Sequence, residues 1–355
     1  MSGDPFERVR QLCRDEAAAR NPKMEWMWGA ALFGYALSEL DALTGADEFT
    51  AFLQAYCDYW VAHPPVMDYA DRVAPALITY AMQKKTGNLD YARLTERALD
   101  YIRHEPRLIS DAVNHLGKSP EARWYPRSIW VDSLMMFSVF PARYAAENGD
   151  WELLDFAARQ PRIYSRYMQD SGAGLWYHSY WVRAGRHHPK GKVFWGRGNG
   201  WVVCALPMIM DEIGSEHQEF EGIRAILNRT AEGVIPWQNP DGSFRTIINK
   251  PSYRELSATA LIAAGILHGV RRGYLDRRYR GAGERAFSAV TKSIYEDSGR
   301  LSLPEISAPT IPLHILPSLC YRLTPRGKNW SYGIAAAAFA SVQYRLLQSG
   351  EVRDV

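Results

Sequence analysis

Two kinds of apolar segment alternate along the chain. In residues 128–146, apolar side chains occupy nearly every position, so a helix built from this segment is apolar on all sides. In residues 90–104, Tyr91, Leu94 and Ala98 recur at intervals of three and four residues, with charged residues between them. The first kind predicts a fully buried helix, and the second predicts a helix with one buried face.

Counting both kinds along the chain predicts six buried and six amphipathic helices. The buried helices are expected near residues 24–43, 68–86, 128–147, 197–213, 255–272 and 330–349, and the amphipathic helices near residues 5–19, 47–62, 90–104, 150–168, 216–234 and 276–295. Gly45, Gly87 and Gly149 each follow one of these segments, and glycine favours the left-handed backbone that ends a helix. The alternation predicts an all-α fold, an (α/α)6 barrel of six helical hairpins that residues 1–355 form as one domain, with the buried helices inside.

The links between the predicted helices differ in length at the two ends of the barrel. Links from an inner to an outer helix have only a few residues, whereas four links in the opposite direction are long and rich in Gly, Pro, Trp, Tyr and His: residues 105–127, 169–196, 235–254 and 296–329. If the hairpins alternate regularly, the long links share one face, and such loops on a rigid scaffold commonly carry function. The inner helices begin at that face, and their N-terminal ends favour an anionic ligand.

Composition excludes several kinds of partner. The 42 Lys and Arg residues balance 39 Asp and Glu residues without forming a basic block, so nucleic-acid binding is not indicated. No apolar run approaches the roughly 18 residues of a membrane span, and no leader is recognisable, so we expect a cytoplasmic protein without membrane contact. The cysteines are far apart and no histidine pair has zinc-binding spacing, so we expect neither a metal ion nor a cofactor.

Two aspartates are the candidate catalytic residues. Asp132 is an acid within an apolar segment, where burial raises the pKa of a carboxyl and makes it a proton donor. The alternative for Asp132 is a carboxylate in an early helical turn, paired with an arginine. Asp71 lies near the start of the second inner helix, where it either shares the cleft with Asp132 or caps the helix that ends before Gly87.

The most unusual segment of the chain, Phe-Trp-Gly-Arg-Gly-Asn-Gly-Trp, runs from Phe194 to Trp201, and its alternate glycines would let the backbone approach a ligand closely. Arg197 can pair with a substrate carboxylate or, structurally, with Asp132 or Glu255. His178 is either a hydrogen-bonding residue of the cleft or an ordinary loop histidine. The predicted substrate-binding residues are Trp28, Trp130, His178, Trp195, Arg197, Asn199, Trp201, Glu255 and Trp330.

With these residues in place, most of the chain resembles glycoside hydrolase families 105 and 88, the unsaturated rhamnogalacturonyl and unsaturated glucuronyl hydrolases. The strings that carry the resemblance are Asp71 with the helix leading to Lys85-Thr-Gly87, Tyr125-Pro126, Ile129-Trp-Val-Asp132-Ser-Leu-Met-Met, Gly174-Leu-Trp-Tyr-His178, Trp195-Gly-Arg-Gly-Asn-Gly-Trp201, Lys250-Pro-Ser-Tyr-Arg-Glu255 and Asn329-Trp330. The resemblance implies a six-hairpin barrel, with Asp132 as the general acid/base and Asp71 as a second important carboxyl. It also implies substrate contacts for His178, Trp195, Arg197 and Trp201.

Two departures from these families concern the links. Members often have a histidine in the loop before the Trp-x-Asp segment, where this chain shows only residues 121–125, and an acid just beyond the Tyr-His pair, where Tyr180 and Trp181 stand. We expect both differences to affect the choice of sugar more than the reaction.

The resemblance implies removal of a terminal 4,5-unsaturated uronic acid from lyase-generated oligosaccharides by hydration of the C4=C5 double bond, and we expect oligosaccharides of the pectin rhamnogalacturonan type. The expected partner is therefore a small anionic unsaturated disaccharide. One alternative is a conventional inverting glycosidase that uses Asp71 and Asp132 as base and acid. Others are a sugar epimerase or isomerase, which typically needs a histidine pair, and a carbohydrate-binding scaffold without catalysis.

Overall fold

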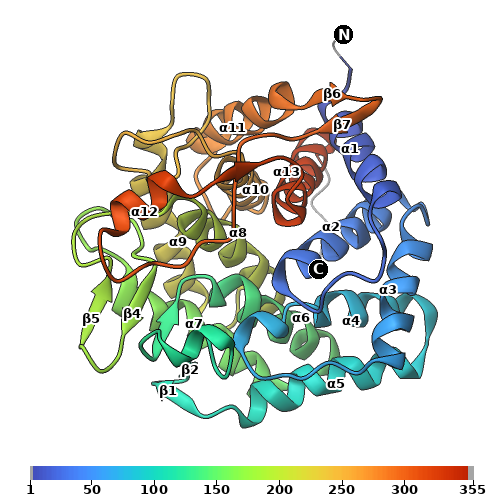
Figure 1. Ribbon diagram of the computed structural model, residues 1–355, viewed down its shortest axis with the longest axis horizontal. Helices are drawn as coiled ribbons and strands as arrows, with labels where there is room; N and C mark the ends of the chain where they lie inside the picture. The colour runs from blue at the N-terminus through green and yellow to red at the C-terminus, as the bar shows by residue number, and fades with distance from the viewer. Residues whose placement is uncertain (1–2, 351–355) are drawn as a thin grey trace.

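The structure, a computed structural model that describes residues 3–350, is a closed double ring of helices (Figure 1). The inner ring consists of α2 (Trp28–Thr44), α4 (Ala76–Thr86), α6 (Val139–Asn148), α8 (Gly196–Ile213), α10 (Leu256–Arg271) and α13 (Ser331–Ser349). The outer ring consists of α1 (Pro5–Ala19), α3 (Thr50–Ala62), α5 (Leu89–His104), α7 (Trp151–Met168), α9 (Phe220–Val234) and α11 (Arg280–Ser293). Successive inner helices contact one another, and α13 contacts α2, which closes the ring. The predicted (α/α)6 barrel is confirmed.

The two kinds of helix differ in burial as their sequences predict. Inner helix α10 buries every residue from Leu256 to Val270. Outer helix α5 buries Tyr91, Leu94 and Ala98 and exposes the charged residues between them. Glycine ends α2, α4 and α6 at Gly45, Gly87 and Gly149, with φ values of 66°, 70° and 68° in the left-handed region.

Two inner helices begin later than predicted. Helix α4 starts at Ala76 instead of residue 68, because Pro75 precedes it and residues 70–72 form a separate 3-10 turn. Helix α6 starts at Val139 instead of residue 128, after the strand β3 (Ser128–Trp130) and a π-helical turn, Leu134–Ser138. The irregular segments before both helices carry the candidate aspartates.

Small antiparallel sheets in the long links are a feature that the all-α expectation left out. They are β1 (Arg107–Ile109) with β2 (Ala112–Val113), β3 with β4 (Ser179–Trp181) and β5 (Arg186–His188), β6 (Tyr295–Asp297) with β7 (Arg300–Ser302), and β8 (Ile306–Ser307) with β9 (Arg326–Gly327). The last link also contains a short helix, α12 (Pro317–Leu323), drawn in orange-red in Figure 1. Across residues 3–350, no helix combines the length and apolar character that crossing a bilayer requires.

Candidate active site

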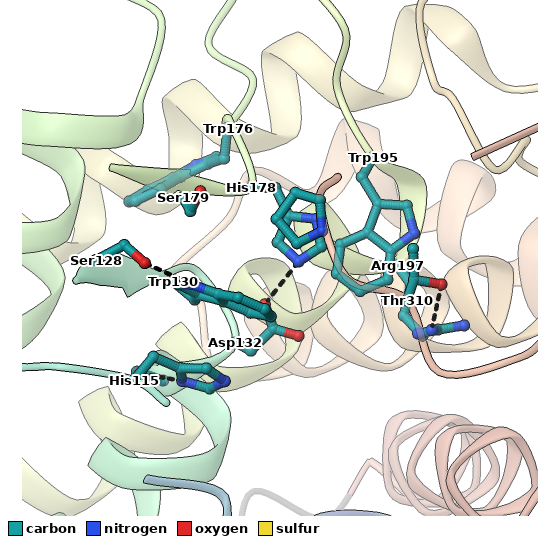
Figure 2. Close-up of polar contacts among 12 residues, drawn as sticks. His115, Ser128, Trp130, Asp132, Trp176, His178, Ser179, Trp195, Arg197 and Thr310 are labelled. Atoms are coloured by element: carbon teal, nitrogen blue, oxygen red, sulfur yellow. Dashed lines mark hydrogen bonds and ion pairs between the residues drawn. The ribbon is translucent and has the colours of Figure 1, made fainter. Parts of the chain in front are cut away.

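Strand pairing brings Asp132 and His178 together. In the ladder between β3 and β4, Trp130 lies opposite Ser179, and the next backbone hydrogen bond runs from the Val131 N–H to the His178 carbonyl. His178 therefore lies beside Asp132, with 3.4 Å between the imidazole Nε2 and the carboxyl Oδ2 (Figure 2). The side chain of His178 is fully buried, and that of Asp132 is 14% exposed.

A second histidine, His115, lies beside Asp71. Its Nε2 lies 3.4 Å from Asp71 Oδ1, its Nδ1 lies 2.8 Å from the hydroxyl of Ser133, and its ring stacks on Trp130 at 4.7 Å. His115 is not among the site residues predicted from the sequence, although it lies in the same link, before residues 121–125.

The two carboxyls have opposite protonation preferences. Burial, together with the negative charges of Asp132 and Glu121, raises the pKa of Asp71 well above its ordinary value. Burial also opposes the charge of Asp132, but the imidazoles of His178 and His115 outweigh it and lower the pKa of Asp132. The prediction of a raised pKa for Asp132 was therefore wrong, although burial acts in the predicted direction: the site favours a neutral Asp71 beside an ionised Asp132.

The structure supports neither of the structural roles considered for the two aspartates, a helix cap for Asp71 and an arginine pair for Asp132. Helix α4 has no side-chain cap, so Asp71 does not cap it, and lies instead in the preceding 3-10 turn. The nearest ionisable partner of Asp132 is His178, and no arginine forms an ion pair with it among the described residues.

Aromatic rings form two walls of the cleft. On the first, Trp130 meets the edge of His178 at 5.2 Å, and His178 stacks on Trp195 at 4.1 Å. On the second, Trp28 packs against Trp201 at 6.0 Å and against Tyr332 at 4.6 Å. Trp330 stacks on Tyr332 and is 38% exposed. These arrangements place the six predicted ring residues Trp28, Trp130, His178, Trp195, Trp201 and Trp330 in two groups, with Arg197 lying between Trp195 and Tyr332.

Arg197 is held by the last long link. Its guanidinium donates to the carbonyls of Ser307 and Ala308 and to the hydroxyls of Ser307 and Thr310 (Figure 2). It pairs with neither Asp132 nor Glu255, so the two structural partners that we considered for it were wrong. The Nε of Arg197 and the indole N–H groups of Trp195 and Trp201 have no protein partner within residues 3–350 and are buried donors that a ligand acceptor would satisfy.

Two predicted substrate contacts prove to be structural. The side chain of Asn199 accepts from the Trp176 N–H and donates to the carbonyls of Trp176 and Trp195, so both of its N–H donors are used. The carboxylate of Glu255 caps α10 by accepting from the N–H groups of Ser257 and Ala258, and it also accepts from the Ser307 N–H. Both side chains are fully buried and hold the backbone segments around the cleft in place.

The alternate glycines before Trp201 serve packing within the protein and not a ligand. A Cβ on Gly196 would lie 2.2 Å from the carbonyl oxygen of Arg245, and one on Gly200 would lie 2.9 Å from the Cβ of Leu261. These glycines therefore let the start of α8 approach its neighbours closely, and the expectation of close backbone approach to a ligand was wrong.

We expect the substitution Asn199→Ala to lower the free energy of unfolding by about 2–4 kcal/mol, because it leaves the buried N–H and carbonyl groups of Trp176 without a partner. Urea denaturation would measure the change. Asn228→Ala, which removes a half-buried amide that donates to two carbonyls on the outer ring, serves as a control with a smaller expected loss. Unchanged stability of Asn199→Ala together with a raised KM would instead make Asn199 a substrate contact.

Comparison with known proteins places this chain in a family. The family model described as Glycosyl Hydrolase Family 88 matches residues 7–347. The chain belongs to glycosyl hydrolase family 88. Among curated members, it is 26% identical over 323 residues to the unsaturated rhamnogalacturonyl hydrolase YesR of Bacillus subtilis, covering 89% of each chain. It is 27% identical over 247 residues to an unsaturated 3S-rhamnoglycuronyl hydrolase of an Alteromonas species, covering 66% of this chain and 59% of that one.

Solved structures related to glycosyl hydrolase family 88 share the fold. A possible family 105 member from Salmonella enterica superposes with a TM-score of 0.85 at 22% identity, covering 97% of this chain and 94% of the other. The unsaturated glucuronyl hydrolase of Bacillus sp. GL1 superposes with a TM-score of 0.75 at 14% identity, covering 96% of each chain. As a glycosyl hydrolase of this family, the chain has a barrel whose mouth holds Asp71 and Asp132. Residues 3–350 contain no cluster of three or more His, Cys, Asp or Glu side chains suited to a metal ion.

Proposed function

We propose that this chain removes a terminal 4,5-unsaturated uronic acid from oligosaccharides produced by polysaccharide lyases, through hydration of the C4=C5 double bond. The observation that carries the proposal is the pair Asp71 and Asp132, whose pKa values are shifted in opposite directions, so that Asp71 is protonated, Asp132 is ionised and the pair together holds one proton. Membership of glycosyl hydrolase family 88 supports the reaction class. The name of the Bacillus subtilis relative supports an unsaturated rhamnogalacturonan disaccharide as the substrate.

The pair supplies both proton transfers that hydration needs. The bound uronate adds a negative charge to the cleft, which raises the pKa of Asp132 and favours movement of the shared proton onto it. Asp132 then protonates C4, and positive charge develops at C5 and the ring oxygen. The ionised Asp132 accepts a proton from the water that adds to C5, and the hemiketal opens to release the saturated sugar.

The remaining residues bind and orient the substrate. The unpartnered donors of Arg197, Trp195 and Trp201 suit the carboxylate and hydroxyl oxygens of the sugar. In the resting site the proton of the pair lies on Asp71, so the two carboxyls together carry one negative charge.

We propose one catalytic domain for the chain, and the family match over residues 7–347 supports this. A cytoplasmic location stays a prediction, supported by the free state of Cys13, Cys57, Cys204 and Cys320.

A spectrophotometric assay tests the proposal. The double bond conjugated to the carboxylate absorbs in the ultraviolet, so we expect the absorbance of an unsaturated galacturonyl-rhamnose disaccharide to fall when the protein is added. The saturated disaccharide is the control and should release no sugar. Release of sugar from the saturated disaccharide would favour a conventional glycosidase, and unchanged absorbance with both galacturonyl and glucuronyl substrates would contradict the proposal.

A further inference from the structure

Tyr321 is the one residue of α12 that is buried, and it contacts His178, 143 residues away in the sequence. Its hydroxyl lies 2.8 Å from His178 Nδ1, and its ring lies parallel to that of Trp195, at 6.2 Å and an interplanar angle of 6°. Tyr321 and His178 are both completely buried. Nothing in the sequence analysis singled out Tyr321, since its segment showed no motif.

We infer that Tyr321 is a positioning residue, which places the proton of His178 on Nε2 and so directs an N–H group toward Asp132. This inference rests on the proposed function for its catalytic consequence, but not for the position of the proton.

The polar neighbours of His178 determine the direction of each contact. An ionised carboxylate can only accept, so the imidazole nitrogen facing Asp132 Oδ2 must carry hydrogen if the contact is to be attractive. In a neutral imidazole the other nitrogen, Nδ1, then has a lone pair and accepts from Tyr321. Burial lowers the pKa of His178 and raises that of Tyr321, so a neutral imidazole and a protonated phenol are the favoured forms.

The anchoring of the last link explains why Tyr321 can hold this position. The carbonyl of Pro312 accepts from the Tyr125 hydroxyl at 2.9 Å, and that of Thr324 accepts from the Tyr253 hydroxyl at 3.2 Å, so the link is tied down on both sides of α12. The opposite face of α12 is exposed, including Leu319 and Leu323. Tyr321 is thus the contact through which α12 docks against the cleft, and the same contact holds the imidazole.

Without the hydroxyl, the preference between the two imidazole tautomers is lost. If the proton moves to Nδ1, the lone pair of Nε2 faces the carboxylate of Asp132 and repels it. The geometry of the first aromatic wall is retained in Tyr321→Phe, since the ring remains to stack on Trp195. This variant therefore separates the hydrogen bond from the packing.

Nitrogen-15 chemical shifts of histidine-labelled protein test the inference, with the signal of His178 identified by its loss in His178→Asn. We expect the native protein to show protonated Nε2 and unprotonated Nδ1, and Tyr321→Phe to show a mixture of tautomers. We also expect Tyr321→Phe to lower kcat about tenfold with little change in KM, as loss of one orienting hydrogen bond would. Tyr91→Phe is the matched control, because it removes the hydroxyl of a buried tyrosine bonded to Asp58 on the outer ring.

Two outcomes would overturn the inference: a native His178 protonated on Nδ1, or Tyr321→Phe with unchanged nitrogen shifts. A fall in kcat without any change in the shifts would also overturn it, because the hydroxyl would then affect turnover without placing the proton of His178. If the native protein acts on no unsaturated substrate, the proposed function fails, whereas the nitrogen shifts still decide where Tyr321 places the proton.

Discussion

Replacing Asp132 by asparagine should lower kcat on an unsaturated disaccharide by at least about 10³-fold, since the variant loses the group that delivers and accepts the proton. The asparagine side chain has nearly the same shape as the aspartate, so the barrel should stay folded. The measurement is the rate of ultraviolet absorbance loss, with calorimetry to show that the substrate still binds.

The same experiment separates catalysis from binding alone. A carbohydrate-binding scaffold predicts no turnover in the native protein and unchanged affinity in Asp132→Asn. Retention of more than a tenth of the native kcat would remove Asp132 from proton transfer.

The second large effect is expected for Asp71→Asn, at about 10²-fold in kcat together with a changed pH profile. In the native site the raised pKa of Asp71 keeps the shared proton bound as pH rises, so activity is lost on the alkaline side only when that proton leaves. In Asp71→Asn the proton must reside on Asp132, whose pKa is lowered, so the alkaline limb of the kcat/KM profile should move to lower pH.

Asp68→Asn is the control for that shift, because Asp68 lies on the same irregular segment and forms an ion pair with Arg72 at 3.1 Å. Its pH profile should match that of the native protein. An alkaline limb that stays in place in Asp71→Asn would show that the two carboxyls do not share a proton.

The ring architecture could be predicted from the sequence because it depends on local patterns. Inner segments are apolar at nearly every position, outer segments alternate at helical spacing, and glycines such as Gly87 end the helices. The start of α6 could not be predicted, because it depends on a strand of only three residues. Strand β3 forms only by pairing with β4, which lies in a different link.

The pKa of Asp132 and the partners of Arg197 could not be predicted from the sequence for the same reason. An isolated buried aspartate has a raised pKa, and the opposite result for Asp132 arises from His178, which the register of β3 and β4 brings to 3.4 Å. The partners of Arg197 lie about 110 residues away in the last link. His115 was within reach of sequence reasoning, since it lies in a long link on the functional face.

The closure of the ring has a consequence for how the protein loses structure. Helix α1 packs against α13, and Arg345 near the end of the chain forms an ion pair with Asp4 at 2.7 Å. Open arrays of helical repeats have two terminal units that can fray independently of the rest. Here every inner helix has an inner neighbour on both sides, so removing any one hairpin breaks two interfaces. Unfolding should therefore be cooperative around the whole circumference, with no hairpin acting as the weak end.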